Sequence, residues 1–475
     1  MIREVAYPKL LRYFEEISAI PRASGHEEGI AEYLVAFAQE KGLSYVRDEW
    51  NNVLISAPAT KGREGISPVL LQGHSDMVCE KNEGVAHDFS KDPLSLYEED
   101  GWIRARGTTL GADNGVAVAV MLAILDGEAH PPLECLFTTS EEVGLDGAIA
   151  FDYRRISARR MINMDGADDT GIIVGSSGGA RSDLTLLGKR TNAPKPCVRL
   201  ALKGLMGGHS GEDIHRGRAN ANCLLGQLLA AIAKEQKLLI ASIDGGSKDN
   251  AIPREATAVF FVEDTAAAKA ALDAVWQSVR KTLCEDDHAA ELSLSPSDGV
   301  SACFDDEMSE KLVRLLATVP NGVFAWEPTL PGLVQFSRNL GVVRTEGDRV
   351  ILTFASRSAK ESQLEASLAE LEGYAIRLGG EIRHHGRYPG WEVAEHSELQ
   401  SHYAEVFRRL SRKELRIESI HAGLECGVIK QAIPEMDLLS CGPVIENLHS
   451  PDERLHKASF ERFFLLITEV LKNIK

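Results

Sequence analysis

Three short apolar segments of this chain each run directly into a polar, acid-rich motif. Residues 69–72 lead into Gly-His-Ser-Asp, 133–138 into Thr-Ser-Glu-Glu, and 161–163 into Met-Asp-Gly-Ala-Asp. Helical patterns alternate with these segments and cover 8–20, 27–41 and 114–126. This alternation predicts an α/β fold with a mostly parallel sheet covered by helices on both faces. Such sheets bind ligands beyond the carboxyl ends of their strands, where all three motifs are expected to lie.

The length of the chain and a change in its pattern of expected secondary structure predict two domains. A chain of 475 residues is too long for one ordinary core. The glycine–serine stretch at 175–180 suits a hinge. Beyond it, a strand–turn–helix pattern occurs at 258–262 and again at 350–354. We therefore predict a split catalytic domain, 1–185 and 393–475, with an inserted α+β lid domain, 186–392, that carries a duplicated strand–helix unit.

The charge balance excludes two classes of partner. Lysine and arginine number 52 against 70 acidic residues, a net charge of −18, whereas nucleic acid and anionic membranes bind basic surfaces. The first 20 residues mix charges into a helical pattern that lacks the apolar core of an export signal. The 8 cysteines are scattered and form no Cys-x-x-Cys pair. We expect reduced thiols and a cytoplasmic location.

Two of the polar motifs are weak when taken alone. His74 follows a strand and could ligate a metal, and Asp76 could fix its tautomer through the other ring nitrogen. An isolated His-x-Asp is more often a loop histidine beside a solvated carboxylate. Asp113 precedes a helix, where aspartate is a common capping residue. The glycines that flank this segment favour close approach to a ligand instead.

The adjacent carboxylates of Glu141 and Glu142 carry a stronger signal. Neighbouring acids repel unless they are exposed or share a cation. Their side chains point in different directions, so one can bind metal while the other takes a proton from water, as metal-assisted hydrolysis requires. A surface acidic pair is the alternative. Asp165 ends the third strand, His209 lies in a Gly-Gly-His-Ser turn, and His449 begins His-Ser-Pro-Asp-Glu. The alternative for His209 is an ordinary loop histidine, and for His449 an Asp-rich turn before the last helices.

The ordered set of motifs resembles a known family. H-x-D, G-x-D-N-G, S-E-E-x-G, a strand-end aspartate, G-G-H-S and a late H-S-P-D-E resemble the dinuclear metallopeptidases that include carnosinases, aminoacylases and bacterial dipeptidases. The resemblance covers essentially the whole chain. The long lid and the strings GADNGVAVA, HAGLECG and LHSPDE are most similar to the Xaa-His dipeptidases of that family.

The resemblance implies two divalent metal ions per chain. His74, Asp113 and Asp165 match the ligands of one ion. Asp113, Glu142 and His449 match those of the other, so Asp113 bridges the pair. Zinc is the expected metal, and histidine with carboxylate ligands also suits manganese or cobalt.

The same resemblance implies catalytic roles for three further residues. Glu141 matches the general base that deprotonates a water bridging the two ions. Asp76 matches the residue that orients the first histidine ligand. His209, on the lid, matches the residue that supports the oxyanion. A cis peptide bond between Asp113 and Asn114 is also implied.

The expected reaction is hydrolysis of dipeptides, in particular Xaa-His dipeptides such as β-Ala-His. Glu425 is placed to bind the α-amino group of the peptide, and Arg357 its terminal carboxylate. Asn250 is expected as a second contact from the lid. Arg338 has no assigned role and is read as a solvated charge or a specificity element. We expect the lid to close over the site and to offer surface for a homodimer.

Three alternatives stay open. Deacylation of N-acyl amino acids, or a broader tri- or aminopeptidase activity, would use the same metal site, and only the lid and HAGLECG favour dipeptides. A non-catalytic binding protein on this scaffold is disfavoured because ligands, base and lid histidine are all present. A structural acidic protein is disfavoured by the clustering of motifs at strand ends.

Overall fold

The computed structural model describes residues 7–328 and 330–475, which form two compact units. The first unit comprises the chain up to Ser176 together with Trp391–Ser419 and Leu424–Lys475. The second comprises Ser177–Gly390 and Ile420–Gly423. These limits differ from the expected division into 1–185, 186–392 and 393–475. The first limit falls earlier because the long strand β9 (Gly178–Leu187) pairs along its whole length with β20 (Arg349–Ser358).

The first unit is built on an eight-stranded sheet whose central strands are parallel. The strand order is β1 (Ser44–Arg47), β2 (Val53–Ala57), β6 (Leu133–Thr138), β3 (Val69–His74), β7 (Arg160–Asn163), β23 (Asp437–Ser440), β8 (Gly171–Ser176) and β22 (Arg416–Ile420). Strands β6, β3, β7 and β23 run parallel to one another. Every residue of β3 and β6 is buried, as expected for apolar runs covered on both faces. The predicted α/β fold with a mostly parallel sheet is confirmed.

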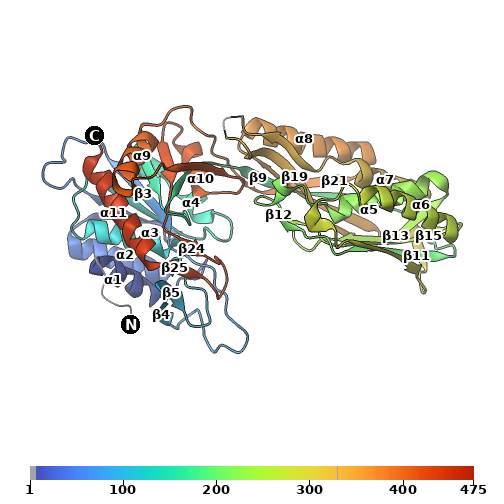
Figure 1. Ribbon diagram of the computed structural model, residues 1–475, viewed down its shortest axis with the longest axis horizontal. Helices are drawn as coiled ribbons and strands as arrows, with labels where there is room; N and C mark the ends of the chain where they lie inside the picture. The colour runs from blue at the N-terminus through green and yellow to red at the C-terminus, as the bar shows by residue number, and fades with distance from the viewer. Residues whose placement is uncertain (1–6, 329) are drawn as a thin grey trace. The chain divides into compact units, whose positions relative to one another are not determined.

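Helices from both ends of the chain pack together in this unit (Figure 1). The N-terminal α1 (Pro8–Ser18) contacts the C-terminal α11 (Lys457–Asn473), where the rings of Phe14 and Phe460 lie 5.7 Å apart. The remaining helices of the unit are α2 (Glu28–Lys41), α3 (Ala112–Leu125), α4 (Asp146–Ala150), α9 (Glu398–Ser411) and α10 (Glu425–Ala432). The C-terminal segment also contributes β23 to the sheet, paired with β7, so the two parts of this interrupted domain form one body.

Helix α3 packs against β3 without an intervening side chain. A Cβ atom at Gly73 would lie 2.4 Å from the Cβ of Ala117, so only glycine allows this approach. Gly111 precedes the helix with φ 63°, a left-handed conformation that glycine adopts without strain. The close packing brings the first turn of α3 beside the end of β3. A small sheet of β24 (Ile445–Glu446), β25 (Arg454–His456), β5 (Trp102–Ala105) and β4 (Leu96–Glu99) completes the unit.

The second unit is an antiparallel sheet with helices packed around one core. Its main path is β16 (Glu291–Pro296), β11 (Cys197–Lys203), β15 (Ala256–Val262), β13 (Leu238–Gly245), β19 (Val334–Glu346), β20, β9 and β21 (Glu381–Tyr388), with β18 (Gly322–Trp326) beside β19. The core joins these strands to α5 (Ala221–Glu235), α6 (Thr265–Val279), α7 (Asp306–Thr318) and α8 (Glu361–Leu378). Both expected strand–helix units are present, as β15 with α6 and β20 with α8.

Two short strand pairs complete the second unit: β12 (Gly208–His209) with β14 (Ala251–Ile252), and β10 (Arg190–Asn192) with β17 (Ala302–Phe304).

Among the described residues of the chain, no helix is long and apolar enough to cross a bilayer.

Candidate metal and catalytic site

Neighbouring strands of the first unit bring the polar motifs to one edge of the sheet. Strand β3 lies between β6 and β7, and His74 at its end is in register with Thr138. The pair Glu141 and Glu142 follows β6, and Asp165 follows β7. Because these strands are parallel, their carboxyl ends meet. Side chains far apart in the sequence therefore lie close together.

Packing and a loop supply two further groups to this edge. Asp113 is in the first turn of α3, which packs against β3. His449 lies between β24 and β25 in the small sheet, with φ 59°. The peptide bond between Asp113 and Asn114 is cis, as expected.

The carboxylate of Asp113 faces two separate donor groups. His74 Nε2 lies 3.0 Å from Asp113 Oδ1 and 3.6 Å from Asp165 Oδ1. His449 Nε2 lies 3.3 Å from Asp113 Oδ2 and 3.2 Å from Glu142 Oε2. Ligand atoms of His74, Asp113 and Glu142 all lie within 4.8 Å of one another. The structure thus brings together the five side chains expected to bind metal.

The chemistry of this donor set fits divalent cations. Burial and the negative charge of Asp113 raise the pKa of Asp165 to about 6. Hydrogen bonds to Asp113 and Glu142 raise the pKa of His449 to about 10. Glu142 Oε1 is buried and has no hydrogen-bond partner among the described residues. Crowded carboxylates and imidazoles of this kind are stabilised by a cation that all of them can ligate.

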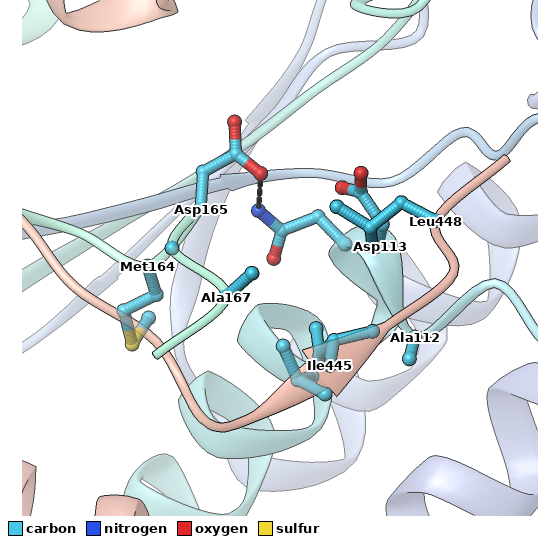
Figure 2. Close-up of a pocket in the computed structure, with 10 residues that line it drawn as sticks. Ala112, Asp113, Met164, Asp165, Ala167, Ile445 and Leu448 are labelled. Carbon is cyan, nitrogen blue, oxygen red and sulfur yellow. Dashed lines mark hydrogen bonds between the residues drawn. The ribbon is translucent and has the colours of Figure 1, made fainter. Parts of the chain in front are cut away.

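Figure 2 shows the carboxylates of Asp113 and Asp165 on the same side of a small pocket whose floor includes Ile445 and Met164. Asn114 Nδ2 donates a hydrogen bond of 2.5 Å to Asp165 Oδ1, marked by the dashed line. The second residue of the cis peptide therefore holds a predicted ligand. Sequence reasoning gave Asn114 no such role.

Asp76 organises two parts of the site. It is fully buried, and its Oδ1 lies 3.2 Å from His74 Nδ1, which leaves Nε2 to face Asp113 and Asp165. Its carboxylate also accepts hydrogen bonds from the backbone N–H groups of Glu141 (3.2 Å) and Glu142 (3.3 Å). Burial opposes the charge of Asp76, but the His74 imidazole beside it outweighs burial and lowers the Asp76 pKa. One carboxylate thus orients an imidazole and fixes the acidic turn.

Glu141 differs from its neighbour in its surroundings. Its carboxylate forms no hydrogen bond or ion pair with any residue in the described ranges, whereas Glu142 pairs with His449. Burial, and after it the charges of Asp165 and Glu425, raise the pKa of Glu141 well above the ordinary value, although His74 opposes the rise. A carboxylate with an elevated pKa beside a ligand cluster can accept a proton near neutral pH.

Two buried residues that sequence reasoning missed hold the Asp113 segment. Both carboxylate oxygens of Glu453 accept backbone N–H groups, over 2.7–3.3 Å, from each residue of Leu110–Asp113. The Arg22 guanidinium donates to the carbonyl oxygens of Ser75, Asp76 and Gly111 at 3.1, 3.0 and 2.5 Å. Glu453 belongs to the string LHSPDE, which was the only available signal. Nothing in the local sequence marked Arg22.

Glu425 lies at the start of α10 and is fully buried. Its Oε2 accepts hydrogen bonds from Gln72 Nε2 (2.5 Å) and Thr138 Oγ1 (2.8 Å). Its Oε1 is buried without a hydrogen-bond partner among the described residues. Burial raises the pKa of Glu425 to about 7, with His74 and Asp165 among the interacting charges. Glu425 therefore belongs to the same charged environment as the ligand cluster.

The second unit carries the three other predicted residues. The backbone N–H of Glu212 donates to His209 Nδ1 at 3.2 Å, which fixes the tautomer with hydrogen on Nε2. Burial and the charge of Arg357 lower the His209 pKa, so the ring is neutral and presents one N–H donor. The carbonyl of Asn250 accepts from Ser210 N at 2.8 Å, which places Asn250 beside His209.

Arg357 is 9% exposed and donates to Tyr388 OH at 2.7 Å, while its buried Nε has no hydrogen-bond partner within the described part of the chain. Arg338 is fully buried, and its guanidinium contacts Ser367 Oγ and Glu370 Oε2, each at 2.7 Å. The reading of Arg338 as a solvated surface charge is therefore wrong. It joins β19 to α8.

Comparison with known proteins gives concordant matches. A family model described as Peptidase family M20/M25/M40 matches residues 70–473. The chain is 40% identical over 467 residues to the cytosol non-specific dipeptidase of Escherichia coli (strain K12), covering 97% of this chain and 96% of that protein. The crystal structure of aminoacylhistidine dipeptidase from Vibrio alginolyticus superposes with a TM-score of 0.93 at 34% identity, over 99% of this chain and 97% of that one. Aminopeptidase PepT from Bacillus cereus ATCC 10987 shares the fold, with a TM-score of 0.60 and 16% identity over 99% of each chain.

Proposed function

Because the chain belongs to peptidase family M20/M25/M40 and is a metallopeptidase, we propose that it hydrolyses dipeptides, including Xaa-His dipeptides such as β-Ala-His, with two divalent metal ions. The family inferred from the ordered motifs is thereby confirmed. The names of the E. coli and V. alginolyticus relatives support dipeptides as the substrate class. The observation that carries the two-ion proposal is the carboxylate of Asp113, which offers one oxygen to each of two donor groups.

We assign His74, Asp113 and Asp165 to one ion and Asp113, Glu142 and His449 to the other. Bound there, two divalent cations would polarise the scissile carbonyl and lower the pKa of a shared water. Zinc suits this set of imidazole and carboxylate ligands, as do manganese and cobalt.

Glu141 is the proposed general base. It takes the proton of the attacking water and returns it to the leaving amine, a role that suits a carboxylate with no hydrogen bond or ion pair to the side chains of the described residues. Burial raises the Glu141 pKa, whereas a bound cation would lower it.

His209 is the proposed donor to the oxyanion. The bond from Glu212 N to its Nδ1 leaves a neutral ring with an N–H at Nε2, the form that can donate to a developing negative charge. This role requires the second unit to approach the metal ligands when substrate is bound. Arg357 is assigned the terminal carboxylate of the peptide and Asn250 a further contact, in line with the unpartnered Nε of the arginine.

Glu425 is the proposed partner of the substrate α-ammonium group. Its buried Oε1, which has no hydrogen-bond partner in the described ranges, can accept from a cation, whereas an N-acylated substrate offers no positive charge at that point. This observation favours dipeptides over N-acyl amino acids. Deacylation and a broader tri- or aminopeptidase activity are the second candidates and share the same ligand set.

A panel of substrates tests the proposal. The protein, loaded with Zn²⁺, Mn²⁺ or Co²⁺, is incubated with β-Ala-His, Gly-His, Leu-Leu, tripeptides and N-acetyl amino acids, and products are quantified by chromatography. We expect hydrolysis of the free-amine dipeptides and weak or no hydrolysis of the others. Turnover of N-acetyl amino acids in preference to dipeptides would replace the proposal with deacylation.

Two further assignments accompany the function. The location is proposed as cytoplasmic, in keeping with the name of the E. coli relative. A homodimer through the second unit is proposed, and sedimentation that showed only monomers would remove it without touching the catalytic assignments.

A further inference from the structure

A hydrogen-bonded series of buried polar side chains ends at Glu425. Gln72, Thr138, Asn163 and Glu425 are all 0% exposed. Gln72 is paired with Asn163 across β3 and β7. Gln72 also lies two residues before His74 on β3, and Asn163 two residues before Asp165, so the series is on the side of the sheet edge that carries the ligands. Buried amides at these positions are costly unless their hydrogen bonds are made.

A backbone N–H group fixes the orientation of both amide side chains, Asn163 and Gln72. The N–H of Asp165 donates to Asn163 Oδ1 at 3.3 Å, which identifies the amide oxygen of Asn163. Asn163 Nδ2 therefore donates to Gln72 Oε1, at 2.6 Å. With its oxygen occupied, Gln72 presents Nε2 to Glu425 and cannot reverse its amide without losing the bond to Asn163.

Both donors that reach Glu425 bind the same carboxylate oxygen. Gln72 Nε2 lies 2.5 Å and Thr138 Oγ1 2.8 Å from Glu425 Oε2, and Gln72 Nε2 also lies 3.1 Å from Thr138 Oγ1. No hydrogen bond reaches Oε1 from the residues that the structure describes. The arrangement saturates one oxygen and leaves the other to a partner from outside the chain.

We propose that Gln72, held by Asn163 and assisted by Thr138, is a positioning residue that aims Oε1 of Glu425 at the α-ammonium group of the substrate. The inference rests on the proposed dipeptidase function and goes one step further. It identifies which oxygen recognises the amine and which side chains select peptides with a free amino terminus over neutral acyl compounds. Without Gln72, the Glu425 carboxylate can rotate to form other hydrogen bonds. The α-ammonium group of the substrate then loses a fixed charge-assisted hydrogen bond.

The test compares two ligands that differ only in the amine. Ala-His carries the α-ammonium, and propionyl-His has the same skeleton without it. In Gln72→Met, which keeps the shape but removes the three side-chain hydrogen bonds of Gln72, KM for Ala-His should rise by about ten- to a hundredfold, the loss expected for a hydrogen bond to a charged group. The kcat for Ala-His and the inhibition constant of propionyl-His should change by less than about threefold, a difference under 1 kcal/mol.

Controls separate positioning from damage to the fold. Gln400→Met makes the same substitution at a half-buried glutamine whose Nε2 donates to the Leu438 carbonyl at 3.3 Å, and it should leave KM unchanged. Thr138→Val should reproduce part of the Gln72→Met effect, and Thr138→Ser, which restores the hydroxyl, should recover it. If Gln72→Met does not fold, the Thr138 pair decides the question.

Each result bears on a distinct claim. An equal loss of affinity for Ala-His and propionyl-His, a loss of bound metal, or an unchanged KM would overturn the positioning role while leaving dipeptide hydrolysis intact. A wild-type protein that is loaded with metal and hydrolyses no dipeptide would overturn the proposed function, and this inference with it.

Discussion

Replacing Glu453 with glutamine exchanges one carboxylate oxygen for an amide nitrogen in a buried setting. The two oxygens together accept four backbone N–H groups at the start of α3, the shortest from Leu110 at 2.7 Å and the longest from Asp113 at 3.3 Å. In Glu453→Gln, one oxygen still accepts its pair of N–H groups. The new NH₂ faces the other pair, so two buried donors lose their acceptor.

The expected loss of stability follows from the two hydrogen bonds that are lost. A buried hydrogen bond to a charged group contributes about 1.5–3 kcal/mol, so two lost bonds should lower the free energy of unfolding by roughly 3–6 kcal/mol. The same turn carries Asp113, the carboxylate shared by the two donor groups. We expect metal affinity to fall by about ten- to a hundredfold, as for other losses of support around ligands.

The assay is guanidinium unfolding of the metal-free protein, followed by circular dichroism, together with metal affinity measured by competition with a chelator. Asp452→Asn is the matched control, because it removes the same charge from the adjacent, exposed position. If Glu453→Gln is no more destabilising than Asp452→Asn and binds metal as tightly as the wild type, the four hydrogen bonds do not support the site.

The remaining predictions concern the metal site and the lid. Metal analysis of the reloaded protein should give two ions per chain and Asp165→Ala fewer, whereas full activity with one ion would exclude a shared carboxylate. Glu141→Ala should abolish turnover and keep both ions, while Glu142→Ala should lose affinity for one, and equal metal loss in both would reverse their roles. His209→Ala should lower kcat by about a hundred- to a thousandfold with metal content unchanged, and a normal kcat would remove it from the reaction. In the metal-free protein the His449 pKa is raised to about 10, so at pH 7 its ring is protonated and metal binding must displace that proton. Affinity should therefore rise with pH up to that value, and calorimetry in buffers of different ionisation enthalpy should detect proton release; an affinity independent of pH would contradict the assignment of His449 as a ligand.

The sequence alone determined the local parts of this site. Mostly apolar runs of strand length that precede His74, Glu142 and Asp165 are readable because burial on both faces of a parallel sheet favours apolar residues. The rule that sites lie beyond the carboxyl ends of parallel strands then placed those side chains at one edge. Family resemblance added Asp113 and His449, whose local patterns were equally typical of a helix cap and a loop.

The tertiary structure alone decided how these parts are held. Glu453 accepts from Leu110, 343 positions away, and Gln72 donates to Glu425, 353 positions away. Periodicity reports which face of an element is buried, but it carries no information on which distant side chain meets that face. Those pairings depend on strand order, on the approach of α3 to β3 at Gly73, and on the packing of α1 against α11. The second unit begins at Ser177, inside the glycine–serine stretch expected as a hinge, and the pairing of β9 with β20 assigns the residues after it to that unit, ahead of the expected limit at 186.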